Sequence, residues 1–264
     1  MLRKRVVTAL WGVPLIIAAV WFDEPLPWFT LLVALWGLLA VLEFYRITAV
    51  SKSWSLAIFG IIWTLLFILC PQFDWSFWIL LASAIVISLS LTLFQHKRAA
   101  FISWVWSLAG VLYVGWLLSF LVLLRLEAGR EWVFLAILAT FGSDTAAYFI
   151  GRAWGRHRMA PRISPGKTWE GAIAGLFGAI IISLLFTLPA PWRLPLGFGE
   201  AVLLGVLISV FGQIGDLLES WIKRRGGVKD SGSLMPGHGG LLDRMDSILL
   251  AGVVVSLYYM FFIA

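Results

Sequence analysis

Acidic and basic side chains alternate between Asp216 and Asp246, in a chain that is otherwise largely apolar. A carboxylate beside hydrocarbon is costly unless it pairs with a cation or binds a metal, so such residues indicate a functional site. Mixed charge with glycine suits a site for a polyphosphate and its metal ions, with arginine and lysine on phosphate oxygens and aspartate on the ions. The acidic side chains of this segment are Asp216, Glu219, Asp230, Asp243 and Asp246, and the basic ones are Lys223, Arg224, Arg225, Lys229 and Arg244.

Asp216 and Asp243 are the leading candidates for metal ligands. Asp216 and Ser220 share one face near the end of a predicted helix, and Asp243 and Asp246 are three residues apart where the next helix begins. Two adjacent helix ends of this kind could hold Mg²⁺, which prefers a few carboxylates together with waters and substrate phosphates. The alternative is structural: Asp246 could cap the last helix, and Asp216 could pair with a cation that follows it.

A glycine-rich turn around His238 is a candidate for phosphate contacts. Gly239 and Gly240 allow the main chain to approach a phosphate and to present N–H groups to it. The imidazole of His238 could contact a phosphate or take part in proton transfer. A single histidine in a loop is a weak signal, and a structural role stays open.

The sequence Ser-Pro-Gly-Lys-Thr at residues 164–168 holds a second candidate, Lys167. It is not a P-loop, because Pro161 stands where that pattern needs glycine and because no strand is expected before it. Trp169 begins a predicted helix, and the N-terminus of a helix attracts anions. Lys167 therefore remains a candidate for contact with a phosphate.

Two further acids lie within predicted helices. Asp144 is inside an apolar helix near its cytoplasmic end, and a carboxylate at that depth should face a cavity or a partner. Glu43 has Arg46 three residues further along the same helix. We therefore interpret Glu43 as a structural residue that pairs with Arg46.

The elements that position these residues are predicted to be transmembrane helices. Hydrophobic residues make up 61% of the 264 residues and charged residues only 13%, against about 25% in soluble domains, and the mean hydropathy is +0.95. Backbone polar groups in lipid must be satisfied internally, so the sequence predicts an all-α polytopic membrane protein. The single cysteine, Cys70, excludes a disulfide framework and a cysteine-rich metal site.

About nine apolar segments approach the roughly 20 residues that a spanning helix needs. They are residues 6–22, 26–46, 55–70, 76–94, 101–124, 132–150, 169–188, 200–222 and 247–263. Together they predict a single integral membrane domain over residues 1–264. Within it, residues 1–131 are expected to form N-terminal helices, and residues 132–264 to hold the catalytic helices and the cytoplasmic loops.

The lysines and arginines determine the predicted orientation. With the N-terminus in the cytoplasm, all of the 20 lysines and arginines lie on the inner side except Arg125, Arg130 and Arg193, in agreement with the positive-inside rule. The two long polar loops, residues 151–168 and 223–246, then both face the cytoplasm and place the active site there. Topology therefore explains the formal net charge of +6, and no nucleic-acid partner is predicted.

Taken together, these residues resemble the signature of the phosphatidate cytidylyltransferases, the CDP-diacylglycerol synthases. In this chain the signature reads Ser220-x-Ile222-Lys223-Arg224-x4-Lys229-Asp230-x-Gly232-x3-Pro236-x-His238-Gly239-Gly240-Leu241-x-Asp243-Arg244-Met245-Asp246. Ser143-Asp144-x3-Tyr148, residues 164–168 and Gly215-Asp216 resemble family features upstream. The resemblance covers roughly residues 142–247, and the earlier helices match only in hydropathy and size. Met235 departs from the leucine, isoleucine or phenylalanine usual at that position, and this change conserves volume.

The resemblance implies an enzyme that converts CTP and phosphatidate to CDP-diacylglycerol and pyrophosphate. The reaction would depend on Mg²⁺, with one or two cations bound in the site. A phosphatidate oxygen would attack the α-phosphorus of CTP in line, so no covalent nucleophile is needed. The implied catalytic residues are Asp216, Asp243, Lys223 and Arg244, and the implied metal ligands are Asp216, Asp243, Asp144 and Asp246. The implied substrate contacts are Ser164, Lys167, Ser220, Arg224, Lys229, Asp230, His238, Gly239 and Gly240. The family suggests a homodimer in the lipid bilayer, and the orientation and size suit a bacterial inner membrane.

Other readings compete with this one. A CTP-dependent lipid kinase acting on a polyprenol or phytol would share the nucleotide and a lipid acceptor, but it would release CDP instead of pyrophosphate. An ion-coupled transporter could also use Asp144 and Asp216, although transport predicts polar groups through the whole depth of the bilayer. The dense aspartate motif of the CDP-alcohol phosphotransferases is not found in the sequence.

Overall fold

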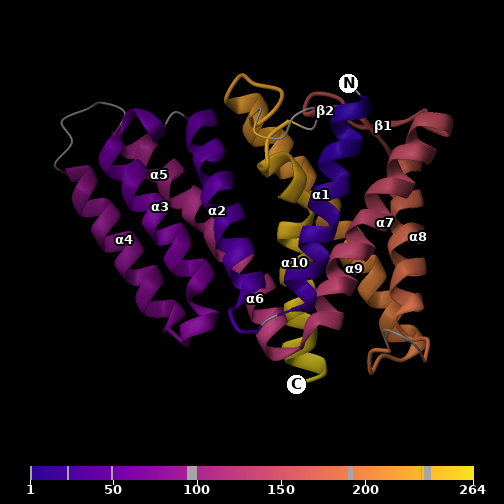
Figure 1. Cartoon of the computed structure of the whole chain (residues 1–264). Coiled ribbons are helices and arrows are strands. Elements are labelled where there is room, and N and C mark those ends of the chain that lie inside the picture. Colours follow the sequence, from indigo (N-terminus) through magenta and orange to yellow (C-terminus); the bar gives the residue numbers. More distant parts are fainter. Residues whose placement is uncertain are drawn as a thin grey trace. The chain divides into compact units, whose positions relative to one another are not determined.

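The computed structural model describes residues 2–22, 24–48, 50–93, 100–189, 193–232, 234 and 239–264, with side chains from residue 10 onward. The chain forms two compact units (Figure 1). The first comprises Met1–Leu126 and Ile222–Arg244, and the second comprises Glu127–Trp221 and Met245–Ala264. Part of the segment that carries the predicted signature therefore belongs with the N-terminal helices.

The first unit is built from apolar helices. It contains α1 (Leu2–Trp21), α2 (Trp28–Ile47), α3 (Trp54–Leu69), α4 (Phe77–Leu93), α5 (Ala100–Gly110) and α6 (Leu117–Glu127). A π-helical turn, Val111–Trp116, joins α5 and α6 into one continuous helix. Short 3-10 turns at Val50–Lys52 and Pro71–Phe73 flank α3. A helix satisfies its own backbone hydrogen bonds, so these apolar sequences need no water along their length.

Small residues allow the helices of the first unit to pack closely. The ring of Tyr45 on α2 occupies space left by Gly60 of α3 and Gly110 of α5, where added side chains would collide with it. The hydroxyl of Tyr45 donates to the carbonyl of Ser107 at 2.8 Å. A buried phenol is therefore satisfied by the backbone of a neighbouring helix, in the manner of polar contacts between membrane helices.

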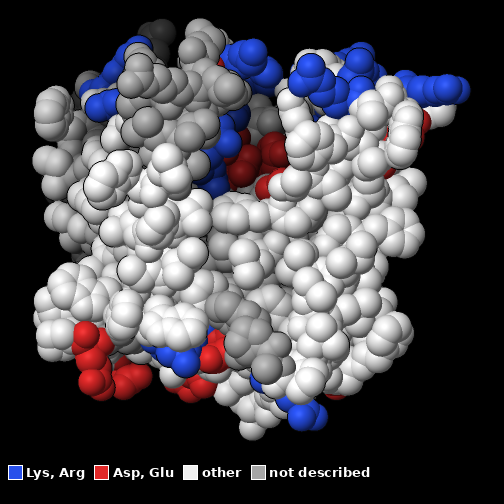
Figure 2. Space-filling view, turned by 45° about the vertical axis from the view of Figure 1, so that its right-hand side comes forward, with Lys and Arg blue, Asp and Glu red and all other residues white. Residues whose placement is uncertain are grey.

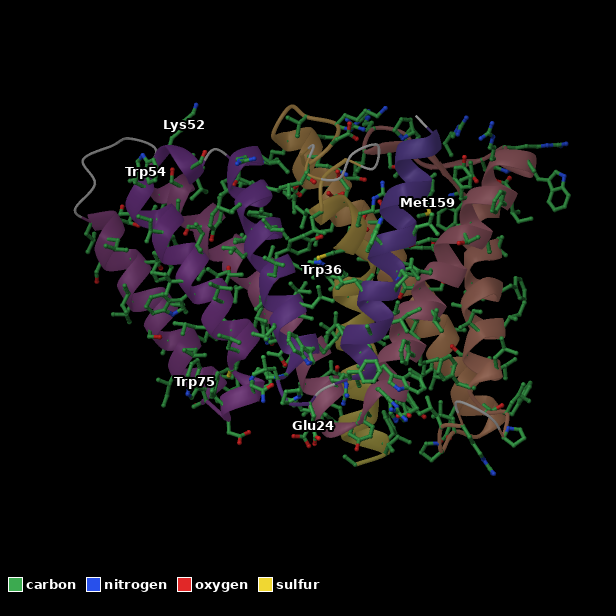
Figure 3. All side chains as sticks on the ribbon, in the orientation of Figure 1. Glu24, Trp36, Lys52, Trp54, Trp75 and Met159 are labelled. Atoms are coloured by element: carbon green, nitrogen blue, oxygen red, sulfur yellow. The ribbon has the colours of Figure 1, made fainter. Side chains whose placement is uncertain are left out.

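Each end of the first unit carries charged and aromatic side chains. Figure 3 shows Lys52 and Trp54 at one end of its helices and Glu24 and Trp75 at the other. Trp54 is 79% exposed and Trp75 is 42% exposed. Exposed tryptophans at both ends of apolar helices are typical of proteins whose helices cross a bilayer.

The second unit combines long helices with a small sheet. Its elements are α7 (Arg130–Trp154), β1 (Arg158–Ala160), β2 (Ser164–Thr168) and α8 (Trp169–Leu185), together with most of α9 (Phe198–Arg225) and α10 (Leu242–Phe262). β1 and β2 pair antiparallel, with Arg158 opposite Thr168 and Ala160 opposite Ser164. α7 and α8 pack against each other through small residues: a side chain at Gly178 would meet the carbonyl of Gly142 at 2.6 Å.

The structure agrees with most of the predicted helices. Each predicted apolar segment contains a helix, although the helix predicted for residues 26–46 begins at Trp28 and that predicted for 169–188 ends at Leu185. By length and composition, five helices could cross a membrane: Trp28–Ile47, Ala100–Glu127, Arg130–Trp154, Phe198–Arg225 and Leu242–Phe262. Shorter apolar helices are Leu10–Trp21, Trp54–Leu69, Phe77–Leu93 and Trp169–Leu185.

Two predictions about local structure are corrected. The fold is mainly α, but the polar loop at residues 151–168 contains the hairpin of β1 and β2, and a strand does lead into α8. β1 has three residues and β2 has five, and a turn that contains proline separates them. Strands this short give too little alternation of apolar and polar residues to be recognised in the sequence. In addition, α10 begins at Leu242 instead of residue 247, so Asp243 and Asp246 both lie within the helix.

Candidate functional site

A lysine of the hairpin meets an aspartate of α9 in the second unit. The Nζ atom of Lys167, on β2, lies 2.7 Å from Oδ2 of Asp216 and donates to the carbonyl of Gln213 at 3.4 Å. Thr168 follows directly and caps α8, its hydroxyl accepting from the amide of Gly171 at 3.2 Å. Because this cap fixes the point where the strand becomes a helix, Lys167 is held in position toward α9.

A second carboxylate lies close to this pair. Asp144, on α7, interacts with the charges of Asp216 and Lys167 and with the hydroxyl of Ser247 at the start of α10. Two carboxylates near one lysine leave an excess of negative charge, which is the arrangement that a cation would stabilise. The second unit therefore brings together three of the predicted candidates, Asp144, Lys167 and Asp216.

Close packing of α9 and α10 fixes the position of Asp216. A side chain at Gly215 would collide with the carbonyl of Asp246. Ser220, one turn further along α9, donates from its hydroxyl to Oδ1 of Asp216 at 3.4 Å. The carboxylate of Asp246 accepts from the amide of Ser247 at 2.8 Å. Glycine at position 215 is therefore required by the approach of the two helices.

Arginine side chains surround the hairpin end of the second unit. Those exposed in this region are Arg152, Arg156, Arg158 and Arg162. Figure 2 shows blue side chains gathered at this end, at the upper right. Nδ1 of His157 lies 2.6 Å from Oε1 of Glu170, which joins the hairpin to the first turn of α8. The surface around Lys167 therefore carries positive charge that would attract an anionic substrate.

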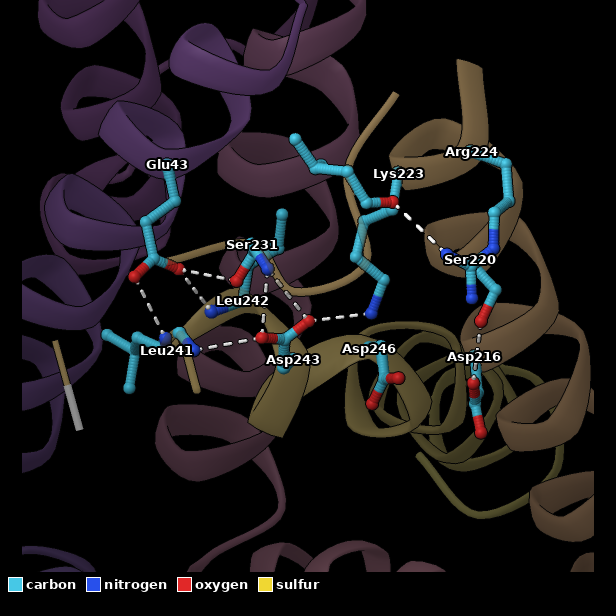
Figure 4. A network of polar contacts seen from close by, with 12 residues as sticks. Glu43, Asp216, Ser220, Lys223, Arg224, Ser231, Leu241, Leu242, Asp243 and Asp246 are labelled. Atoms are coloured by element: carbon cyan, nitrogen blue, oxygen red, sulfur yellow. Dashed lines mark hydrogen bonds and ion pairs between the residues drawn. The ribbon is translucent and has the colours of Figure 1, made fainter. Parts of the chain in front are cut away.

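In the first unit, Asp243 is held by a lysine and by two backbone amides. Its Oδ1 lies 2.6 Å from Nζ of Lys223. The amide of Ser231 donates to both carboxylate oxygens, at 3.2 and 3.0 Å, and the amide of Gly240 donates to Oδ2 at 2.8 Å. Figure 4 shows this arrangement at the start of α10. Asp243 therefore closes the loop between α9 and α10 while it contacts Lys223.

Glu43 is a member of this network that the sequence analysis did not place there. Its carboxylate is completely buried and accepts from the hydroxyl of Ser231 at 2.9 Å and from the amides of Leu241 and Leu242 at 3.1 and 2.9 Å (Figure 4). These donors, rather than Arg46, are its partners. A lone carboxylate in an apolar helix is the signal that could have identified it.

The other predicted residues take different places. Arg224 is exposed and donates to the carbonyl of Val228 at 3.3 Å, so it holds the loop that follows α9. Gly239 has a φ of 88°, a conformation that favours glycine. Lys229, Asp230 and Arg244 are exposed, and Ser164 is half-buried on β2. His238 lies outside the described residues.

The assignment of metal ligands stays a prediction. Asp216 belongs to the second unit and Asp243 to the first, so the sharing of one cation by the two stays a prediction. Within the described ranges, no cluster of three or more histidine, cysteine, aspartate or glutamate side chains forms a ready-made metal site. Asp144 and Asp216 nevertheless offer the oxygen ligands that Mg²⁺ prefers when waters and substrate phosphates complete its shell.

Comparisons with known proteins agree with this chemistry. The Cytidylyltransferase family matches residues 3–262. The chain is 31% identical to the phosphatidate cytidylyltransferase of Bacillus subtilis over 240 residues, 88% of each chain. It is 36% identical to the enzyme of that name from Staphylococcus saprophyticus over 221 residues, 80% of this chain and 83% of the relative.

A higher identity covers a shorter region. The chain is 42% identical to the phosphatidate cytidylyltransferase of Brucella suis over 159 residues, 58% of this chain and 56% of the relative. The match thus spans little more than half of that protein. Because the family match extends over nearly the whole sequence, the predicted resemblance is confirmed, and this chain belongs to the cytidylyltransferase family.

Proposed function

We propose that this protein is a phosphatidate cytidylyltransferase, which converts CTP and phosphatidate to CDP-diacylglycerol and pyrophosphate. One observation carries the proposal: the two leading candidates for metal ligands each lie against a lysine expected to bind phosphate. Asp216 contacts Lys167, and Asp243 contacts Lys223. The names of the relatives indicate which nucleotide and which lipid such a site would take.

The reaction needs charge stabilisation more than covalent chemistry. A phosphate oxygen of phosphatidate forms a bond to the α-phosphorus of CTP, and the bond from that phosphorus to the bridging oxygen of the β-phosphate breaks as pyrophosphate leaves. Lys167 and Lys223 would neutralise negative charge that moves onto the leaving group. Ser220, whose hydroxyl donates to Asp216, would orient that carboxylate and would not act as a nucleophile.

The divalent cation would be held by the carboxylates predicted as its ligands. Asp216 is the proposed central ligand, with Asp243, Asp144 and Asp246 as further oxygen donors. A bound Mg²⁺ would neutralise charge on the triphosphate and on the leaving pyrophosphate. The remaining proposed contacts to the substrates are Arg224, Lys229, Arg244, Asp230, Ser164, His238, Gly239 and Gly240.

The proposed setting is a bilayer. In this proposal the apolar helices form about nine spans, the N-terminus and the polar loops face the cytoplasm, and two copies of the chain form a homodimer. Exposed tryptophans at both ends of the first unit and exposed arginines beside the hairpin support such an orientation, because the positive-inside rule puts the arginine-rich end in the cytoplasm. A bacterial inner membrane fits this arrangement.

The products of the reaction test the proposal. Purified full-length protein would be mixed with labelled CTP and phosphatidate in detergent micelles, and the products separated. We expect pyrophosphate and CDP-diacylglycerol in equal amounts. Release of CDP with a phosphorylated lipid would indicate kinase chemistry, and it would refute the proposal.

A further inference from the structure

The carboxylate of Glu43 holds two backbone segments of the first unit at once. One segment contains Ser231, whose hydroxyl donates to it. The other is the start of α10, where Leu241 and Leu242 donate their amides. The first N–H groups of a helix have no partner within that helix, and a negative charge beside them is stabilised by the helix dipole. Glu43 therefore helps to determine where α10 begins.

These same two segments hold Asp243. The amide of Ser231 donates to the carboxylate of Asp243, while its hydroxyl donates to Glu43. The amide of Gly240, next to the residues that Glu43 contacts, also donates to Asp243. Displacement of the Glu43 carboxylate would therefore move the donors that fix Asp243, and with it the contact to Lys223.

Two glycines of the loop lie directly against the carboxylate of Glu43. A side chain at Gly232 would meet Oε1 of Glu43 at 2.5 Å, and one at Gly240 would meet Oε2 at 2.5 Å. Glycine at these two positions is thus explained by the close approach of the loop to a buried carboxylate. A side chain at either glycine would therefore displace the carboxylate or the loop that contacts it.

We infer that Glu43 is a positioning residue for the proposed cytidylyl transfer, acting through Ser231 and the start of α10 to place Asp243 and Lys223. This inference rests on the proposed function. It gives α2, in the N-terminal part of the chain, an influence on the reacting groups that passes through Ser231 and the start of α10. Misplacement of such groups by about 1 Å can cost about 100-fold in rate.

Glu43→Gln tests the inference in the full-length protein. The substitution keeps the shape of the side chain but replaces one acceptor oxygen with a donor that faces other donors. We expect kcat to fall by about tenfold or more, with KM for CTP changed by less than about twofold. The matched control is Tyr45→Phe, on the same helix, which also removes a buried hydrogen bond and should keep the kcat of the wild type.

Two further measurements separate positioning from general destabilisation. Hydrogen–deuterium exchange in peptides from residues 229–245 should become faster in Glu43→Gln and stay unchanged in Tyr45→Phe. Ser231→Ala, a milder change, should lower kcat as well. The double variant should lose less than the product of the two single losses, because both act through one contact.

The outcomes distinguish the inference from the function on which it rests. Active wild-type protein together with a Glu43→Gln variant of unchanged kcat would overturn the positioning role alone, as would unchanged exchange in residues 229–245. If Glu43→Gln fails to fold, an unaltered kcat in Ser231→Ala would overturn it equally. Wild-type protein that makes no CDP-diacylglycerol would refute the proposed function instead.

Discussion

The ammonium group of Lys223 lies 2.6 Å from the carboxylate of Asp243, with only 12% and 9% of the two side chains exposed. A pair removed from water to this degree strongly constrains both partners, since loss of either leaves the other charge uncompensated. Asp243 also accepts from two backbone amides. The pair therefore links a proposed phosphate ligand to the structure of the loop before α10.

Removal of the lysine should destabilise the protein as well as inactivate it. Lys223→Met leaves the carboxylate of Asp243 without its cation, and we expect a loss of about 3 kcal/mol in the free energy of unfolding. Denaturant titration in detergent would measure this loss. Lys52→Met, at an exposed lysine of the same unit, should change stability by less than about 0.5 kcal/mol. Equal stability of the two variants would contradict the importance of the buried pair.

Asp216 should matter for catalysis more than for folding. Its pair with Lys167 is partly exposed, with 31% and 21% of the side chains accessible, and such pairs add little stability. Asp216→Asn should therefore fold normally but lose about 100-fold or more in kcat, because a negatively charged ligand near the phosphates is gone. Glu170→Gln, at a carboxylate on the first turn of α8, is the control. Near-normal turnover by folded Asp216→Asn would end the metal-site proposal.

Gly215 should tolerate no side chain. Gly215→Ala would place a methyl group against the carbonyl of Asp246 and force α9 and α10 apart, at a cost of about 1–3 kcal/mol. Turnover should fall too, since Asp216 is the next residue. Gly199→Ala, in the same helix with open space around it, should leave both the stability and the turnover unchanged. Thermal unfolding and turnover would be measured for both variants. Equal stability and equal turnover of Gly215→Ala and Gly199→Ala would argue against the steric explanation.

Removal of divalent cations should stop the reaction. With excess chelator we expect product formation to fall below detection, and addition of Mg²⁺ should restore it, because the proposed ligands are oxygen donors. Asp144→Asn should raise the Mg²⁺ concentration needed for half-maximal rate, since it removes one carboxylate beside Asp216. Full activity in chelator would contradict the proposed role of the cation.

Much of the architecture could be predicted because apolar runs leave the backbone few alternatives. The helix that carries Asp216 was predicted to end at residue 222 and ends at Arg225, and α8 begins at Trp169 as expected. The hairpin before α8 was missed, since its strands are short and polar and owe their pairing to the connection between α7 and α8. Helix periodicity gives no information about such a turn.

The candidate site, like the fold, could be predicted only in part. Local spacing was sufficient to name Asp216, Lys167, Asp144 and the acids of α10 as candidates, because charge beside apolar helices has few explanations other than function. The partner of each charge was not determined locally. The structural alternative paired Asp216 with a cation that follows it on the same helix, whereas Asp216 meets Lys167 from a different element.

Hydropathy and motif spacing are properties of neighbouring residues, so the order of the amino acids was enough to predict the helices, the family and the kinds of side chain that could hold phosphate and metal. The contact of Glu43 on α2 with Leu241 and Leu242 at the start of α10 follows only from the folded arrangement, because a buried carboxylate accepts hydrogen bonds from whichever donors the packing of distant helices brings to it. No pattern along the chain encodes which donors those are.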